Sequence, residues 1–175
     1  MKTVEVKIRG ISALLMHSFP LVPIEALEKK TPDEQAEFAA YRDPKTKELY
    51  IPGPNLQRAF VSGASYSKGK GRGNLSRVAA ACLIVSPERI SLNTKTFVVD
   101  SRPIVVPATK GRVLRHRPRL DSWECIFQLE YDENLMTENQ VRRIVDDTGS
   151  RVGLLDFRPE KRGPFGRFMV TNWDS

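Results

Sequence analysis

"WECIFQLEYD", residues 123–132, is the stretch that most clearly indicates the fold of this chain of 175 residues. Its apolar residues Cys125, Phe127 and Leu129 alternate with polar ones. This period of two is typical of a β-strand that buries one face and exposes the other. We therefore expect a strand in a sheet that is covered on one side.

Two helices are expected around this strand. In "TENQVRRIVDDTG", residues 137–149, Thr137 is a typical N-cap residue, and Gly149 is expected to end the helix. In "PNLQRAFVSGA", residues 54–64, apolar residues recur at three- and four-residue spacing, which is typical of a helix with one buried face.

The remaining strands are expected at both ends of the chain and in its middle. Residues 3–10 alternate apolar and charged side chains up to Gly10, which is expected to mark a bulge. Residues 79–92 are predicted to form a buried strand whose start lies on the end of a helix, and residues 167–173 a closing strand. The order strand, helix, strand, strand, helix, strand predicts an α+β, ferredoxin-like fold, with a four-stranded antiparallel sheet and two helices on one face. RNA-recognition domains share this frame and bind bases on the open sheet face, but many other activities use it too.

We expect residues 1–175 to form a single domain with three insertions. The first, about 19–50, is acidic and has a capping box at Thr31 that predicts a short helix. The second, 67–77, is a glycine-rich basic loop. The third, 100–121, is an arginine-rich hairpin or thumb.

Positive charge is segregated along the sequence. The chain has 28 Lys and Arg against 21 Asp and Glu, a net charge of +7. No acid interrupts the cations of 68–77 or of 102–120, and a third basic stretch, "DFRPEKRGPFGRF", covers 156–168. Cations on extended or glycine-rich segments suit a phosphate backbone, because arginine presents a planar fork to phosphate oxygens.

These segments supply the predicted nucleic-acid-binding residues. The cations are expected to contact phosphates, and an aromatic ring and a histidine are expected to stack on bases. The residues are Lys68, Lys70, Arg72, Arg102, Arg112, Arg115, His116, Arg117, Arg119, Arg158, Lys161, Arg162, Phe165 and Arg167.

The sequence offers little catalytic machinery. It has no HExxH, GxSxG, CxxC or Walker motif and no carboxylate pair with metal-site spacing, so no cofactor, metal or catalytic residue is predicted. Cys82 and Cys125 lie in apolar runs, which predicts buried thiols and fits a reducing compartment. No signal peptide or membrane span is recognised, and we expect a cytoplasmic protein without a membrane partner.

Two stretches resemble a known family. "LYIPGPNLQRAFVSGA", residues 49–64, resembles the IPGSSLKGALR-like segment of the RAMP superfamily of CRISPR-associated RNA-binding proteins, through Ile51, Pro52, Gly53, Leu56 and Arg58. "GPFGRFMV", residues 163–170, resembles that superfamily's C-terminal glycine-rich loop, through Gly163, Phe165, Gly166 and Arg167. The helix departs from the family pattern at Pro54-Asn55.

This resemblance implies a ferredoxin-like core with a thumb that binds CRISPR RNA, closest in type to the backbone subunits of effector complexes. Such a subunit assembles along the RNA with copies of itself and with other subunits. No active site carries over.

The leading hypothesis is therefore a protein that binds single-stranded nucleic acid, RNA rather than DNA. One alternative is a metal-independent endoribonuclease that processes CRISPR RNA, with His17 as the general base. A second is a phage- or mobile-element-encoded mimic that binds effector proteins.

Overall fold

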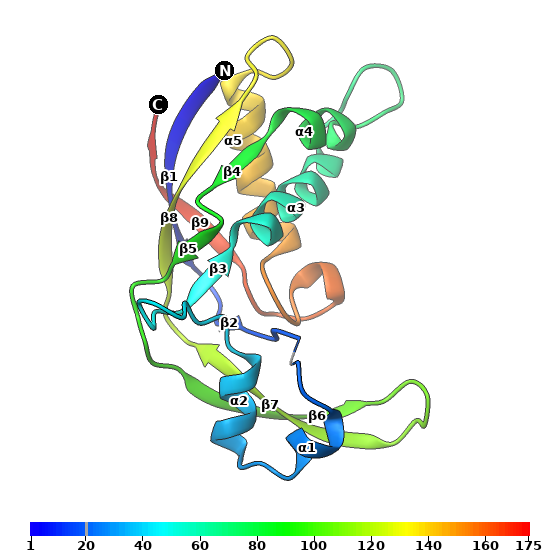
Figure 1. The fold of residues 1–175 in the computed structure, drawn as a ribbon. Coiled ribbons are helices and arrows are strands. Elements are labelled where there is room, and N and C mark those ends of the chain that lie inside the picture. The colour runs from blue at the N-terminus through cyan, green and yellow to red at the C-terminus, as the bar shows by residue number, and fades with distance from the viewer. Residues whose placement is uncertain (20) are drawn as a thin grey trace.

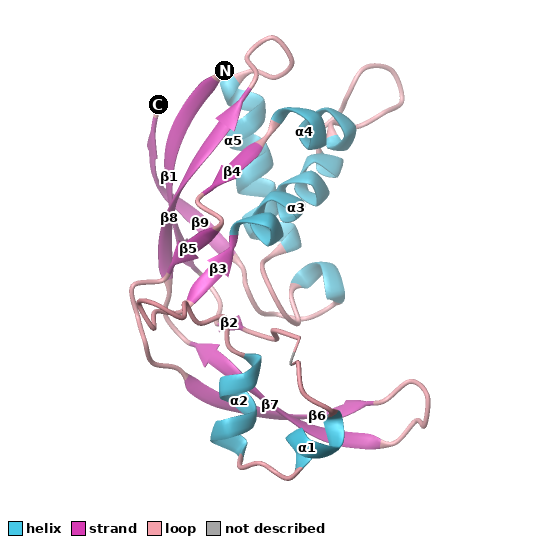
Figure 2. Ribbon diagram, viewed as in Figure 1, coloured by secondary structure: helices cyan, strands magenta, loops and turns pink. Residues whose placement is uncertain are grey.

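The computed structural model describes residues 1–19 and 21–175, and the chain curves into two lobes (Figure 1). The upper lobe is a four-stranded sheet with helices against one face, and the lower lobe is a long hairpin with two short helices (Figure 2). Both chain termini lie at the far end of the upper lobe.

The sheet of the upper lobe has the predicted topology. Its strands are β1 (Lys2–Gly10), β4 (Ile84–Ser86), β8 (Glu124–Tyr131) and β9 (Phe168–Asp174), in the order β4-β8-β1-β9. All three neighbouring pairs are antiparallel. This order, with α3 (Gly53–Gly63) and α5 (Glu138–Asp147) packed on one face, confirms the ferredoxin-like α+β prediction.

The core lies between this sheet and its helices. The alternating residues Val4, Val6 and Ile8 of β1 are completely buried. The ring of Phe60 on α3 lies 5.8 Å from that of Phe127 on β8, measured between centroids. The period of two in the strands therefore decides which face the helices cover.

The other face of the sheet is charged. The side chains that alternate with the buried ones are Thr3, Glu5, Lys7 and Arg9 on β1, and Glu124, Ile126, Gln128 and Glu130 on β8. None of these is aromatic and three are acids. This face therefore lacks the stacked rings with which an RNA-recognition domain holds bases.

The predicted helix end at Gly149 is wrong. Thr137 caps α5 with a capping box as expected, but the chain continues through a π-helical turn, η2 (Thr148–Val152), and leaves it at Gly153, whose φ is +74°. Gly149 is instead needed for packing, because an added Cβ would lie 2.3 Å from the carbonyl oxygen of Phe168.

The bulge predicted at Gly10 is also displaced. The register of β1 against β9 shifts between Lys7 and Ile8. Gly10 makes room for the Trp123 indole, whose Nε1 would lie 2.0 Å from an added Cβ. Its role is close packing, not a break in pairing.

Residues 79–92 begin on the end of a helix as predicted, but the rest forms two short strands instead of one. The alanine-rich start belongs to a helix, α4 (Ser76–Cys82), because alanine has the highest helix propensity. After β4 comes the short strand β5 (Arg89–Ser91), which pairs with β3 (Tyr50–Pro52). A single turn, η1 (Ala64–Tyr66), follows α3.

The lower lobe contains two of the three insertions. The segment 100–121 lies in a hairpin, β6 (Val98–Val105) and β7 (Arg112–Leu120), to which β2 (Leu14–Leu15) adds a third strand. The acidic segment forms α1 (Ile24–Glu28) and α2 (Pro32–Ala39), and α2 packs against the hairpin. The capping box at Thr31 is confirmed.

Among the described residues, no helix combines the length and the apolar character that crossing a bilayer requires.

Candidate nucleic-acid interface

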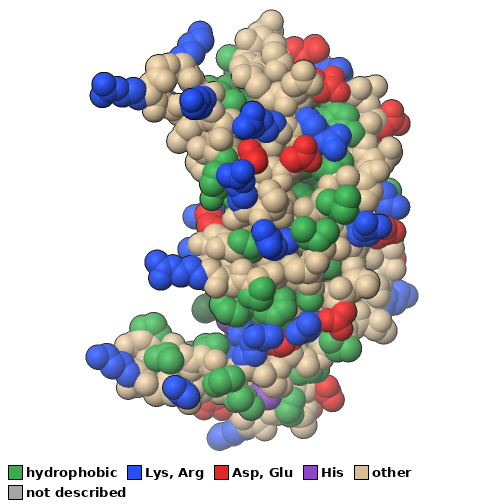
Figure 3. Space-filling model, turned by 180° about the vertical axis from the view of Figure 1, so that it is seen from behind, with side chains coloured by type: hydrophobic (Ala, Val, Ile, Leu, Met, Phe, Trp, Pro, Cys, Tyr) green, Lys and Arg blue, Asp and Glu red, His purple; other side chains and the backbone are tan. Residues whose placement is uncertain are grey.

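The three basic segments reach the same side of the molecule. In Figure 1 the loop before α4, the loop around η3 (Pro159–Lys161) and the tip of the β6–β7 hairpin all project toward the open side between the lobes. Figure 3 shows this side as an indented outline with Lys and Arg side chains along it. Segments that are far apart in the sequence thus line one concave surface.

The loop 67–75 is a tight turn with exposed cations. Lys68 pairs with Asn74, and the amide of Gly69 donates to the carbonyl of Gly73 at 2.9 Å. Buried Leu75 anchors the loop to the core. Lys68, Lys70 and Arg72 are exposed, and no acceptor for their side chains lies within the described part of the chain. Their charges are therefore available to a ligand.

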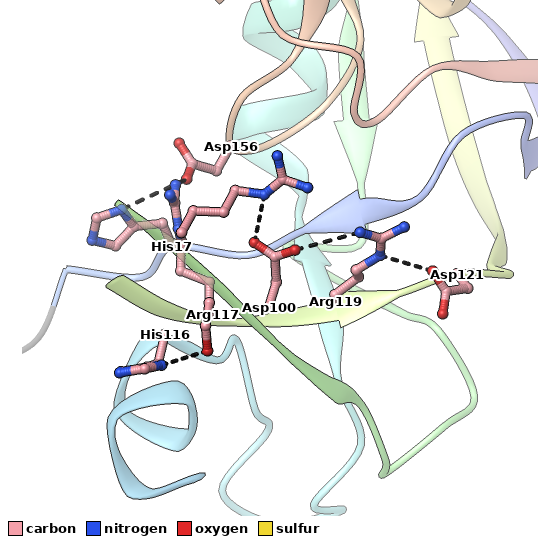
Figure 4. Close-up of polar contacts among 9 residues, drawn as sticks. His17, Asp100, His116, Arg117, Arg119, Asp121 and Asp156 are labelled. Atoms are coloured by element: carbon pink, nitrogen blue, oxygen red, sulfur yellow. Dashed lines mark hydrogen bonds and ion pairs between the residues drawn. The ribbon is translucent and has the colours of Figure 1, made fainter. Parts of the chain in front are cut away.

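The hairpin has two chemically different faces. Its register places Asp100 opposite Arg117 and Arg102 opposite Arg115, on the face toward the upper lobe. Ser101 and His116 lie opposite each other on the other face, 2.6 Å apart between Oγ and Nδ1. Figure 4 shows His116 on the opposite side of the strands from Arg117 and Arg119. The structure therefore does not bring His116 to the arginine surface.

Three of the hairpin arginines are engaged by carboxylates (Figure 4). Asp100, only 8% exposed, accepts from Arg102 Nε at 2.8 Å and Arg119 Nη1 at 3.4 Å. Arg119 Nε also donates to Asp121 at 2.8 Å. Arg117 is buried and donates to Asp156, which belongs to the upper lobe. Arg117 thereby joins the hairpin to the upper lobe, whereas the ion pairs of Arg102 and Arg119 lie within the hairpin.

Phe165 is part of the same contact. It is only 4% exposed, and the guanidinium carbons of Arg102 and Arg119 lie 4.8 and 5.3 Å from its ring centroid. Cations stacked on a buried ring stabilise packing and leave no face for a base. The aromatic residue of this loop that reaches solvent is Phe157, which is 36% exposed and has a φ of +48°.

The glycine-rich loop is held by its own backbone and its arginines. Position 166 requires a glycine, because its φ is +77° and an added Cβ would lie 2.0 Å from the Leu154 carbonyl oxygen. Arg158 donates to Glu160 at 3.0 Å and to the Leu155 carbonyl. Arg167 donates twice to the Ser150 carbonyl. The loop is therefore shaped by Arg158 and Arg167, while Lys161 and Arg162 extend into solvent.

The predicted residues thus separate into two groups. Arg102, Arg117, Arg119, Arg158, Phe165 and Arg167 make internal contacts. The cations without an acceptor among the described residues are Lys68, Lys70, Arg72, Arg112, Arg115, Lys161 and Arg162. For Arg115, the Nε atom is buried and unpartnered. Arg112 shares its face of β7 with His116, so the other six cations of this second group form the candidate interface.

A polar hollow of about 460 Å³ opens beside this interface. It lies between α3, the residues around His17 that follow β2, and the loop before η3. Its lining residues are His17, Tyr41, Asn55, Arg58, Ala59, Ser62, Gly153, Leu154, Leu155, Asp156, Arg158, Glu160 and Lys161. The sequence reasoning selected only part of this set. Arg58 appears in the family resemblance but was not selected as a binding residue, although its place on the polar face of the predicted helix is a second signal for it.

The surroundings of His17 in this hollow favour its neutral form. Burial lowers the pKa of its imidazole, and the charges of Arg117 and Arg115 lower it further. Its Nδ1 lies 3.8 Å from Asp156 Oδ2, beyond hydrogen-bond distance, and that oxygen also accepts from Arg117. Within residues 1–19 and 21–175 no three His, Cys, Asp or Glu side chains form a group that would bind a metal.

No family model matches this chain. No curated protein matches it either. Among solved structures it is similar to a chain in the cryo-EM structure of the Type III-B Cmr-beta bound to cognate target RNA, with a TM-score of 0.58 and 14% sequence identity. The alignment covers 98% of this chain but 59% of that one, so this chain spans less than two thirds of its neighbour's length. At this identity the likeness shows the fold alone.

Proposed function

We propose that this protein binds single-stranded RNA as a CRISPR-associated, backbone-type subunit that assembles along the strand. The observation that carries the proposal is the convergence of three basic segments on one concave side. The sequence likeness to RAMP proteins and the similarity to a chain of an RNA-bound effector complex support it. Copies of the chain and other effector subunits are its proposed partners.

The salt dependence of binding tests this function. Each phosphate contact to a single strand contributes about −0.7 to the slope of log affinity against log salt, so about five contacts give a steep fall between roughly 50 and 300 mM. We expect this fall for single-stranded RNA, measured by fluorescence anisotropy, and weaker binding of single-stranded DNA. Binding that does not respond to salt would contradict the proposal.

Two matched double variants test whether the RNA lies on the concave side of the molecule. Lys70→Gln with Arg72→Gln removes two exposed cations of the loop, and we expect the slope to become shallower by about 1.4. Lys7→Gln with Arg9→Gln removes the same two residue types from the charged outer face of the sheet. This control is expected to leave the slope unchanged. If both double variants reduced the salt slope equally, the concave side would not be the RNA-binding surface.

The endoribonuclease alternative has one observation in its favour, the neutral His17 beside Asp156 in a polar hollow. A neutral imidazole can take the proton of a ribose 2′-hydroxyl without a metal. Labelled hairpin RNA incubated with EDTA distinguishes the two functions. Defined cuts that disappear in His17→Ala support the enzyme, and intact RNA in a stable complex supports the binding protein.

A further inference from the structure

The polar hollow beside the interface has the size of a ligand site. Its volume of about 460 Å³ lies within the range of roughly 300–1,000 Å³ that small-molecule sites occupy. Its walls come from separate parts of the chain, with Arg58 on α3 and Lys161 on η3. A single phosphate would fill only part of this space, whereas a nucleotide has room for its sugar as well.

The carboxylates of the hollow are already neutralised. Asp156 accepts a hydrogen bond from buried Arg117. Glu160 accepts one from Arg158 at 3.0 Å. Neither carboxylate therefore leaves a full negative charge to repel an anion.

Two cations of the hollow remain uncompensated. Within the described part of the chain, the side chains of Arg58 and Lys161 have no hydrogen-bond acceptor or ion-pair partner. His17 adds a neutral imidazole, since burial and then the nearby Arg117 and Arg115 lower its pKa. The site thus offers two positive charges and an uncharged polar group.

We propose that this hollow binds the terminal phosphomonoester of a nucleic-acid strand. An internal phosphodiester carries one negative charge, whereas a terminal phosphate carries about −1.5 to −2 at pH 7, which matches two free cations. Asn55 and Ser62, also in the lining, supply polar groups for the terminal sugar. This inference rests on the proposed function and adds to it that the chain recognises one end of its strand.

The test compares one 12-nucleotide RNA, labelled internally, with a 5′-phosphate, with a 3′-phosphate and with neither. One phosphorylated form is expected to bind more than about tenfold tighter than the hydroxyl form, since hydrogen bonds to charged groups contribute about 1.5–3 kcal/mol and 1.4 kcal/mol is a factor of ten. The form that binds tighter identifies the 5′ or the 3′ end. Titration with nucleoside 5′- and 3′-monophosphates, followed by NMR, gives a readout that does not depend on the strand.

Variants connect the preference to the hollow. Arg58→Gln and Lys161→Gln are each expected to remove the preference, while Arg9→Gln, on the far face of the sheet, keeps it. Equal affinity of the three RNA forms, with salt-dependent binding intact, would overturn this inference and leave the proposed function in place. Failure of all three RNAs to bind while the mononucleotides do would overturn the proposed function and support the phosphate site. A preference for the phosphorylated RNA that persists in Arg58→Gln and Lys161→Gln would overturn the inference that the hollow binds the terminal phosphate.

Discussion

The segment 102–120 of the β6–β7 hairpin and the loop 67–75 both carry cations with no acid between them, yet these charges meet different surroundings in the fold. In the hairpin, Arg102 is paired with a carboxylate on β6 and Arg119 with one just after β7. Arg117 is paired with a carboxylate of the upper lobe. Lys70 and Arg72 of the loop extend into solvent. The same sequence signal therefore corresponds to a structural clamp in one region and to a candidate ligand surface in the other.

This difference teaches that acids outside a run of arginines decide what the run does. Asp100 and Asp121 lie two residues from Arg102 and Arg119, whereas the partner of Arg117 is far away in the sequence. Asp156 lies 39 residues from Arg117 and still accepts its hydrogen bond. A net charge counted over a window cannot detect such a partner. Substitutions at these residues test this division, beginning with the largest expected effect.

Phe165→Ala is expected to cost about 3–5 kcal/mol in the free energy of unfolding, because it removes a buried ring that Arg102 and Arg119 cover. Chemical denaturation measures the loss. Phe157→Ala, at a ring that is 36% exposed, is the control and should cost clearly less. Equal, small losses in both would mean that the clamp contributes little to stability.

Arg117→Met is expected to cost about 2–4 kcal/mol, less than a fully buried pair, since the Asp156 side chain is 29% exposed. Adding Asp156→Asn should recover part of the loss, because no unpaired carboxylate then remains at position 156. A double-mutant cycle by urea denaturation measures the coupling. Strictly additive losses would show that the two side chains do not interact.

Arg115 and Arg119 lie on the same face of β7 and allow the sharpest comparison within one strand. Arg115→Gln is expected to reduce the salt slope of RNA binding by about 0.7, the contribution of one phosphate contact. Arg119→Gln should lower stability and leave the slope unchanged, because Asp100 and Asp121 hold that guanidinium. The reverse pattern would exchange the roles assigned to these two arginines.

Glu138 is expected to give the smallest effect, because its ion pair with Lys2 is partly exposed to solvent. Hydrogen bonds from Lys2 and Trp173 lower the pKa of Glu138 to about 2. A carboxyl group with a lowered pKa stabilises the fold above its unfolded pKa near 4.5, and this contribution disappears as the pH falls toward 2. Glu138→Gln should therefore unfold more easily than the parent at pH 7 and equally easily near pH 2, as urea denaturation at both pH values would show.

The fold was largely predictable because its signals are local. The alternation in 123–132, the N-cap Thr137 and the apolar spacing of 54–64 each act within a few residues and correspond to β8, α5 and α3. The errors arose where packing outweighed local preference. Gly149 was predicted to end a helix, but the position requires a glycine because Phe168 lies against it. Gly10 is required in the same way because Trp123 lies against it.

The candidate site was less predictable. Sequence reasoning found the basic segments but could not separate Phe165, which is buried, from Phe157, which reaches solvent. His116 is next to two arginines in the sequence, and the strand pleat turns it to the opposite face. The hollow with Arg58 and His17 joins residues from distant segments, which no local pattern reports.

By itself the sequence determined the order of strands and helices and the three segments in which cations gather, because periodicity and composition are properties of neighbouring residues. Only the tertiary structure decided which of those cations keep a free charge. That choice depends on the hairpin register, which brings Asp100 to Arg119, and on the fold of the whole chain, which brings Asp156 to Arg117.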